Sequence, residues 1–216
     1  MHALLLLLVT LGPAKASGQH VGIAISDLQA LHQEEGRPPQ EPAFGTSATG
    51  WSLFVPGGQV FVYVAPSAGA LDAWVALQLE RQRPPPEPVP TPAEGVDAAW
   101  RRGTDLALLR DGNVGILVQG TTEATEEAAL VRGLIRDEGP PWPAPPQVQP
   151  EPDGTWSVLA PGAVHVAWQG GRRAEGPGPR FLAPPDRLVA WDGFGRAAVS
   201  SPAPPEPPGA PEPSPP

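Results

Sequence analysis

The stretch TDLALLRDGNVGILVQGTTEATEEAALVRGLIRDE, residues 104–138, decides the fold of this chain. Two apolar runs, 106–109 and 114–118, flank an Asp-Gly-Asn sequence. Such a sequence between β-prone runs predicts a hairpin, because Gly and Asn tolerate the positive φ that the turn needs. After Gly120, acidic residues come first and arginines last, as the helix dipole favours, so we expect a helix that begins near Thr122 with a threonine cap. Its apolar stripe would lie on the hairpin and comprises Leu130, Val131, Leu134 and Ile135.

A second hairpin is predicted upstream of this stretch. The runs 51–55 and 59–64 flank Pro-Gly-Gly, which is a strong turn signal. Both faces of 59–64 are apolar, and this favours a central strand or one that a helix covers. Ser67 then caps a predicted helix whose last turn contains Arg81, just before three consecutive prolines.

Two smaller elements complete the first domain. A serine capping box predicts a short helix at 27–35, in which we interpret His32 as a solvent-facing residue. Residues 96–100 have the composition of a strand that leads into the first hairpin. Helices interleaved with these strands can cover one face of an antiparallel sheet, so the sequence predicts an α+β fold of two layers.

The first residues have the anatomy of a secretory signal peptide at 1–16. An apolar run at 4–11 is too short to span a bilayer, Pro13 ends it, and Ala-Lys-Ala supplies the small residues that signal peptidase prefers. We expect cleavage after Ala16. The alternative is that this run forms a buried N-terminal helix.

Proline and glycine divide the rest of the chain, with 33 and 25 residues respectively out of 216, a level at which part of a chain stays unpacked. We expect an α+β domain at 17–138, a proline-rich linker at 139–153, a small all-β module at 154–199 and a disordered proline-rich tail at 200–216. Trp142 in the linker would anchor onto a domain surface or an interface. The predicted strands of the module are 156–159, 163–168 and 187–191.

Charge and composition narrow the class of partner. Without residues 1–16 the chain keeps 13 basic and 23 acidic residues, a net charge of −10 with neutral histidines. This acidity argues against nucleic acid and against anionic membrane surfaces. The single lysine and the abundant Arg, Ala, Gly and Pro are typical of a GC-rich bacterial genome, and the chain has no cysteine.

Sequence motifs for catalysis, metal binding or cofactor binding are weak. We therefore predict a non-enzymatic protein with no cofactor and no metal. No nucleophile elbow, clustered metal ligands or phosphate loop occurs in the sequence. The sequence at 193–198 matches the G-x-G-x-x-A dinucleotide fingerprint after a predicted strand. Pro202 leaves no room for the helix that this motif requires, so its glycines are interpreted as turn residues. Residues 111–113 lack the later ligands of a calcium loop. His165 is the one histidine inside a predicted strand, and it has no obvious catalytic partner.

Three tryptophans of the β module, Trp156, Trp168 and Trp191, are the candidate ligand contacts. Exposed rings could stack on sugars, whereas buried rings would be core residues. The leading hypothesis is an exported scaffold or binding protein of the bacterial envelope that acts through protein–protein contacts. The alternatives are a glycan- or peptidoglycan-binding module that uses these tryptophans, and an extracytoplasmic hydrolase with spatially assembled acidic residues.

Overall fold

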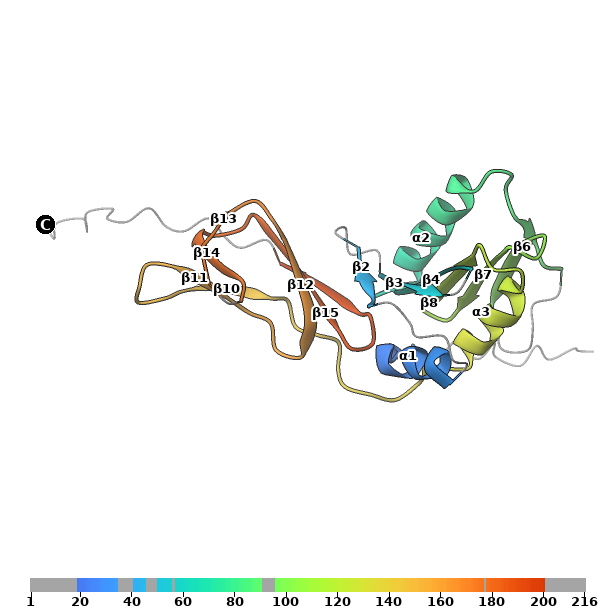
Figure 1. The fold of residues 1–216 in the computed structure, drawn as a ribbon, viewed down its shortest axis with the longest axis horizontal. Coiled ribbons are helices and arrows are strands. Elements are labelled where there is room, and N and C mark those ends of the chain that lie inside the picture. The colour runs from blue at the N-terminus through green and yellow to red at the C-terminus, as the bar shows by residue number, and fades with distance from the viewer. Residues whose placement is uncertain are drawn as a thin grey trace, which may run out of the picture.

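The structure is a computed structural model that describes residues 19–34, 41–45, 50–55, 57–90, 96–176 and 178–200. The predicted signal peptide at 1–16 and the tail beyond residue 200 lie outside these residues. Figure 1 shows two bodies side by side, the first formed by α1 to β9 and the second by β10 to β16.

A seven-stranded antiparallel sheet is the centre of the first body, in the order β2-β3-β4-β8-β7-β6-β5. Both predicted hairpins are confirmed, and Gly112 takes the positive φ, 56°, that the β7–β8 turn requires. The strands are β2 Ala43–Phe44, β3 Trp51–Val55, β4 Gly58–Val64, β5 Glu87–Pro88, β6 Ala98–Arg102, β7 Leu106–Asp111 and β8 Val114–Gln119.

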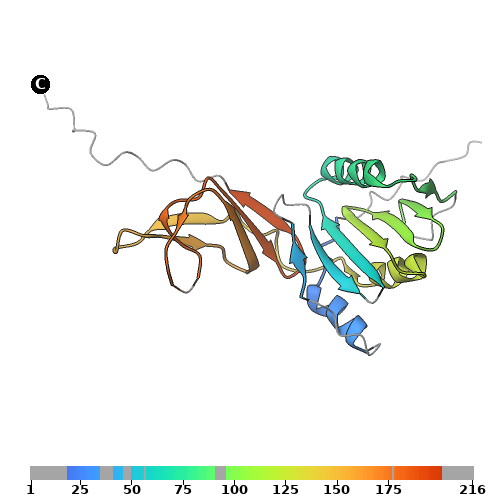
Figure 2. The ribbon, with the colours of Figure 1, turned by 45° about the horizontal axis from the view of Figure 1, so that its top comes forward.

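Helices cover both faces of this sheet. The valines of β4 point into a core shared with α1 (Ile25–Glu34) and α3 (Ala124–Arg132), whereas Phe61 and Tyr63 contact a second core under α2 (Ala68–Arg81). Figure 2 shows α2 above the sheet and the other two helices below it. The α+β class is confirmed, but the layering differs from the expected single helical layer, because alternate residues of the central strands are apolar on both sides.

The helix boundaries follow local hydrogen bonding. In α2, Ser67 Oγ accepts the Ala70 N–H at 3.3 Å, so the predicted serine cap is confirmed. In α1, the N–H of Leu28 donates to the carbonyl of Ala24, so the helix begins two residues before the predicted start. His32 is buried in it, which makes the solvent-facing interpretation wrong.

The helix α3 is shorter than predicted. It begins at Ala124 with no side-chain cap, and it ends at Arg132, with Gly133 at the C-cap. Leu130 is exposed, and the buried face consists of Ala124, Ala128 and Val131. The predicted threonine cap and Leu130 stripe are therefore wrong. Ile135–Arg136 instead form β9, which pairs with β1 (Gly22–Ile23) near the start of the described chain.

The second body contains two small antiparallel sheets, ordered β10-β11-β14-β13 and β12-β15-β16. The three predicted strands are confirmed, and β10 occupies part of the predicted linker at 139–153. The strands are β10 Gln147–Pro150, β11 Trp156–Leu159, β12 Ala163–Gln169, β13 Arg172–Arg173, β14 Arg180–Ala183, β15 Arg187–Asp192 and β16 Ala197–Ser200.

Candidate functional site

A buried arginine ties the loop between β15 and β16 to the proline-rich segment that connects the two bodies. Arg196, in the loop between β15 and β16, pairs with Asp192 at 2.7 Å through its Nε and donates to the carbonyls of Pro140 and Pro141 at 2.9 and 3.0 Å. Its side chain is only 4 % exposed and lies against the ring of Trp142, whose indole N–H donates to the Ala197 carbonyl. Because a buried charge is tolerated only when it is paired and hydrogen-bonded, these contacts fix the loop to the proline-rich segment. Trp142 is thus the anchor that its position suggested.

The same loop between β15 and β16 contacts the first body. The Gly193 carbonyl accepts the N–H of Ile25 at 2.9 Å, and a parallel bridge joins Arg196 to Val64. Gly195 adopts φ 76°, and a Cβ there would come within 1.9 Å of the indole nitrogen of Trp51. These glycines lie in the turn between β15 and β16, as predicted, and Gly195 also permits a close approach between the two bodies.

A groove of about 580 Å³ lies at this junction. Both bodies contribute to it, and the imidazole of His165 stacks flat on the Phe44 ring, 4.5 Å between centroids and 7° between planes. Val164, at a bulge in β12, is 60 % exposed beside them. The lining residues are Ile25, Ser26, Gln29, Glu41, Pro42, Phe44, Val164, His165 and Gly193.

The chemistry of the groove is mostly apolar and neutral. Burial lowers the pKa of His165 below its ordinary value, so this ring is neutral at pH 7. Ser26 and Glu41 line the same groove, but no hydrogen bond joins either of them to His165 in the part of the chain that the structure describes. The groove therefore contains the residue types of a nucleophilic triad without the proton relay that connects them.

The three candidate tryptophans do not share one surface. Trp191 is fully buried at the junction, with Phe44 and His165 each 5.5 Å from its ring. Trp168 is 39 % exposed and meets Phe181 edge-on, and the half-buried Trp156 is the cross-strand neighbour of the same phenylalanine. Of the three rings, Trp191 is thus closed to a ligand, whereas Trp156 and Trp168 are partly exposed and both lie beside Phe181.

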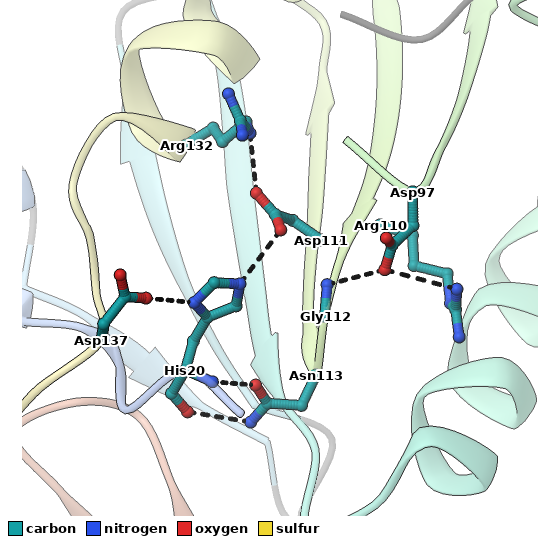
Figure 3. A network of polar contacts seen from close by, with 8 residues as sticks. All are labelled: His20, Asp97, Arg110, Asp111, Gly112, Asn113, Arg132 and Asp137. Atoms are coloured by element: carbon teal, nitrogen blue, oxygen red, sulfur yellow. Dashed lines mark hydrogen bonds and ion pairs between the residues drawn. The ribbon is translucent and has the colours of Figure 1, made fainter. Parts of the chain in front are cut away.

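A polar network surrounds His20 in the N-terminal segment (Figure 3). Its Nδ1 lies 2.6 Å from Asp137 and its Nε2 lies 3.0 Å from Asp111, which also accepts from Arg132 at 2.7 Å. Asn113 holds the backbone of His20 from both sides, accepting its N–H at 2.7 Å and donating to its carbonyl at 3.1 Å. The Asp-Gly-Asn sequence therefore does more than form a turn.

A third feature is an acidic cavity of about 590 Å³ at the start of α3. Glu123, Glu126 and Glu127 line it, and His32 in its wall lies 3.2 Å from the Glu127 carboxylate. The pair explains why a histidine is buried at this position, since each partner compensates the other.

Comparison with models of known families, with curated proteins and with solved structures finds no significant match to this chain. Within the described ranges, no helix combines the length and apolar character needed to cross a membrane. In the same residues, no group of three or more His, Cys, Asp or Glu side chains is arranged to hold a metal ion.

Proposed function

We propose that this protein is an exported, non-enzymatic binding protein of the bacterial envelope, which contacts a partner protein at the junction groove. The observation that supports this most is that both bodies build the groove. The loop between β15 and β16, which the buried Arg196 ties to the connecting segment, contacts the first body through Ile25 and Val64. A preformed surface of this kind binds without a large ordering cost.

The composition of the groove favours a polypeptide partner. Ile25, Phe44 and Val164 supply apolar contacts, and Ser26 and Gln29 supply neutral hydrogen-bonding groups. Interfaces between proteins have this mixture of an apolar centre and a polar rim. In addition, β12 borders the groove and pairs only with β15 among the described strands, so its outer edge can accept an extended segment.

Site-specific photo-crosslinking in bacterial cells tests this function. A photoreactive amino acid at Val164 should give adducts to a second polypeptide. The same amino acid at Leu182, which is also apolar and exposed in the second body but does not line the groove, should give none. Adducts from both positions alike, or from Leu182 alone, would exclude the groove as the binding site.

Export is tested separately by the mass of the mature protein in the envelope or medium. We expect a chain that begins at Ser17, after loss of residues 1–16. A cytoplasmic protein that retains Met1 would contradict the proposal.

A hydrolase is the second candidate, because one observation favours it. His165 is neutral, and it lines the same groove as Ser26 and Glu41. A general base typically raises the rate of the catalysed reaction at least about 100-fold. Purified protein should then cleave some member of an ester and peptide panel, and His165→Gln should lower that rate by about this factor, whereas the binding function predicts no turnover by either form.

A further inference from the structure

The strand β12 is the longest strand at a sheet edge among the described residues. It has seven residues and pairs only with β15 in its sheet, so its other side is an open edge (Figure 1). Every other edge strand in the described ranges has four residues or fewer. An open edge presents unpaired N–H and C=O groups, which form a template for pairing with another chain.

The sequence of β12 lacks the features that keep an edge strand from pairing. Proteins protect sheet edges with charged side chains, with proline or with very short strands. Elsewhere in this chain, β5 contains Pro88, β10 contains Pro150, and β13 consists of two arginines. In contrast, β12 is AVHVAWQ, with neither proline nor an acidic, lysine or arginine residue. Its bulge lies at one end, so the residues from His165 to Gln169 keep a regular register.

The side chains along this edge are partly open to solvent. Val164 is 60 % exposed and Trp168 is 39 % exposed, and Val166 and Ala167 between them are half-buried. Cross-strand pairs of aromatic and β-branched side chains stabilise antiparallel sheets. The partner that fits this edge is therefore another uncharged strand of high β-propensity.

Opposite charges lie at the two ends of β12. Glu41 lines the groove beside Val164 at one end, and the guanidinium of Arg173 lies over Trp168 at the other, 5.6 Å from the ring centroid. Both residues are exposed, and neither forms an ion pair within the described ranges. In a two-fold antiparallel pair of β12 strands, the Trp168 end of each copy lies beside the Val164 end of the other. Arg173 of each copy then faces the Glu41 side chain of its partner, so the edge is complementary to itself.

We propose that two copies of this chain pair edge to edge through β12, which joins their three-stranded sheets into one continuous antiparallel sheet. The pairing goes beyond the function assigned to the groove, and the two are distinguishable. In the cross-linking experiment at Val164, an adduct of twice the chain mass reports the pairing, and an adduct of another mass reports a different partner.

Analytical ultracentrifugation of the purified full chain tests the pairing. The wild type should show a reversible monomer–dimer equilibrium. Glu41→Arg and Arg173→Glu should each weaken it about tenfold, because two attractive contacts per dimer become repulsive. An equimolar mixture of the two variants should associate as tightly as the wild type, because every contact between the copies again joins opposite charges. A wild-type chain that stays monomeric up to about 1 mM, or a mixture that associates no better than either variant alone, would overturn the proposal.

The effect of net charge is controlled with two exposed residues of α2, in the first body. Glu80→Arg and Arg81→Glu change the net charge of the chain by the same amounts as the two edge variants. Both should leave the dimer as strong as in the wild type. Equal weakening by these controls would show that overall repulsion, and not the β12 edge, sets the association.

Single cysteines identify the edge that pairs, because the chain has no cysteine of its own. Val166→Cys or Ala167→Cys, near the centre of β12, should form a disulfide between two copies, since residues directly opposite in an antiparallel pair lie within disulfide range. Val199→Cys is the control, at the other edge of the same sheet and 40 % exposed. No disulfide at either central position, or an equal yield at Val199, would contradict pairing through β12.

Discussion

At the scale of single residues, the most consequential side chain is Arg196. Its guanidinium has protein acceptors for Nε and for both terminal nitrogens, and they come from two separate segments. The sequence did not single out Arg196, because it lies within a dinucleotide fingerprint that is rejected for want of a following helix, and only the glycines of that motif received a role. The signal that could have found it is the spacing of Asp192 and Arg196, four residues apart around a tight turn.

Arg196→Met should destabilise the folded chain by about 3–5 kcal/mol, because it leaves the buried carboxylate of Asp192 without its partner. Urea unfolding followed by tryptophan fluorescence measures the change. Arg180→Met is the matched control, since the pair of Arg180 with Asp153 is exposed and its loss should barely move the midpoint. Equal shifts for the two variants would show that the Arg196 pair contributes no more than a surface contact.

His165 gives a prediction about pH. Burial lowers its pKa below the ordinary value of 6.5, so the unfolded chain takes up a proton more readily than the folded chain does. The stability that this ring contributes is complete above about pH 6.5 and is lost as the pH falls toward the lowered pKa. The wild-type urea midpoint should therefore drop more between about pH 7.5 and pH 5 than that of His165→Gln. Identical acid sensitivity of the two proteins would contradict this.

At the scale of elements, the contact of α2 with the sheet depends on a missing side chain. Gly115 in β8 lies under Trp74 of α2, and a Cβ there would come within 2.4 Å of the indole ring. The helix can approach the sheet this closely only because the central strand has a glycine at that point.

Gly115→Ala should destabilise the fold by about 1–3 kcal/mol, since the ring and the helix must shift to admit the methyl group. Gly69→Ala, in the first turn of α2 and surrounded by open space, should instead stabilise it by about 0.5–1 kcal/mol through the better helix propensity of alanine. Thermal unfolding by circular dichroism distinguishes these opposite signs. A stabilised Gly115→Ala protein would mean that α2 does not pack as described.

Elements with local signals were predicted well. The Asp-Gly turn, the Pro-Gly-Gly turn and the Ser67 cap each act within a few residues, and the structure confirms all three elements. The end of α3 was misplaced because Ile135 and Arg136 leave the helix to pair with β1, about 113 residues earlier in the chain. No local pattern contains that partner.

The candidate sites depend even more on distant contacts. His20 meets carboxylates 91 and 117 residues away, and the sequence around it has no periodicity that would indicate them. The groove likewise joins Phe44 to His165 across the two bodies. Local turn, cap and strand patterns predict that such a chain folds as α+β with a β module, whereas the sites form only when separate segments come together.

At the scale of the whole molecule, the second body depends on the first. Its buried apolar residues are few among those described: Phe181, Leu188, Val189, Ala190, Trp191 and Ala198. Trp191 is buried partly by Phe44 of the first body, so docking completes the small core. The two bodies are therefore expected to unfold together, although their sheets are separate.

Gly195→Ala tests this dependence directly. The new methyl group would overlap the Trp51 indole and push the loop between β15 and β16 away from the first body. The sheet and helices of the first body would keep their own contacts. Gly162→Ala is a close control, because Gly162 has nearly the same positive φ, 75°, with nothing within 4 Å. Both replacements carry a backbone penalty of about 1–2 kcal/mol, and only the first adds the clash. Small-angle scattering should show a larger radius of gyration for Gly195→Ala alone, with helical circular dichroism retained. If both variants scatter like the wild type, the second body does not need this loop to stay docked.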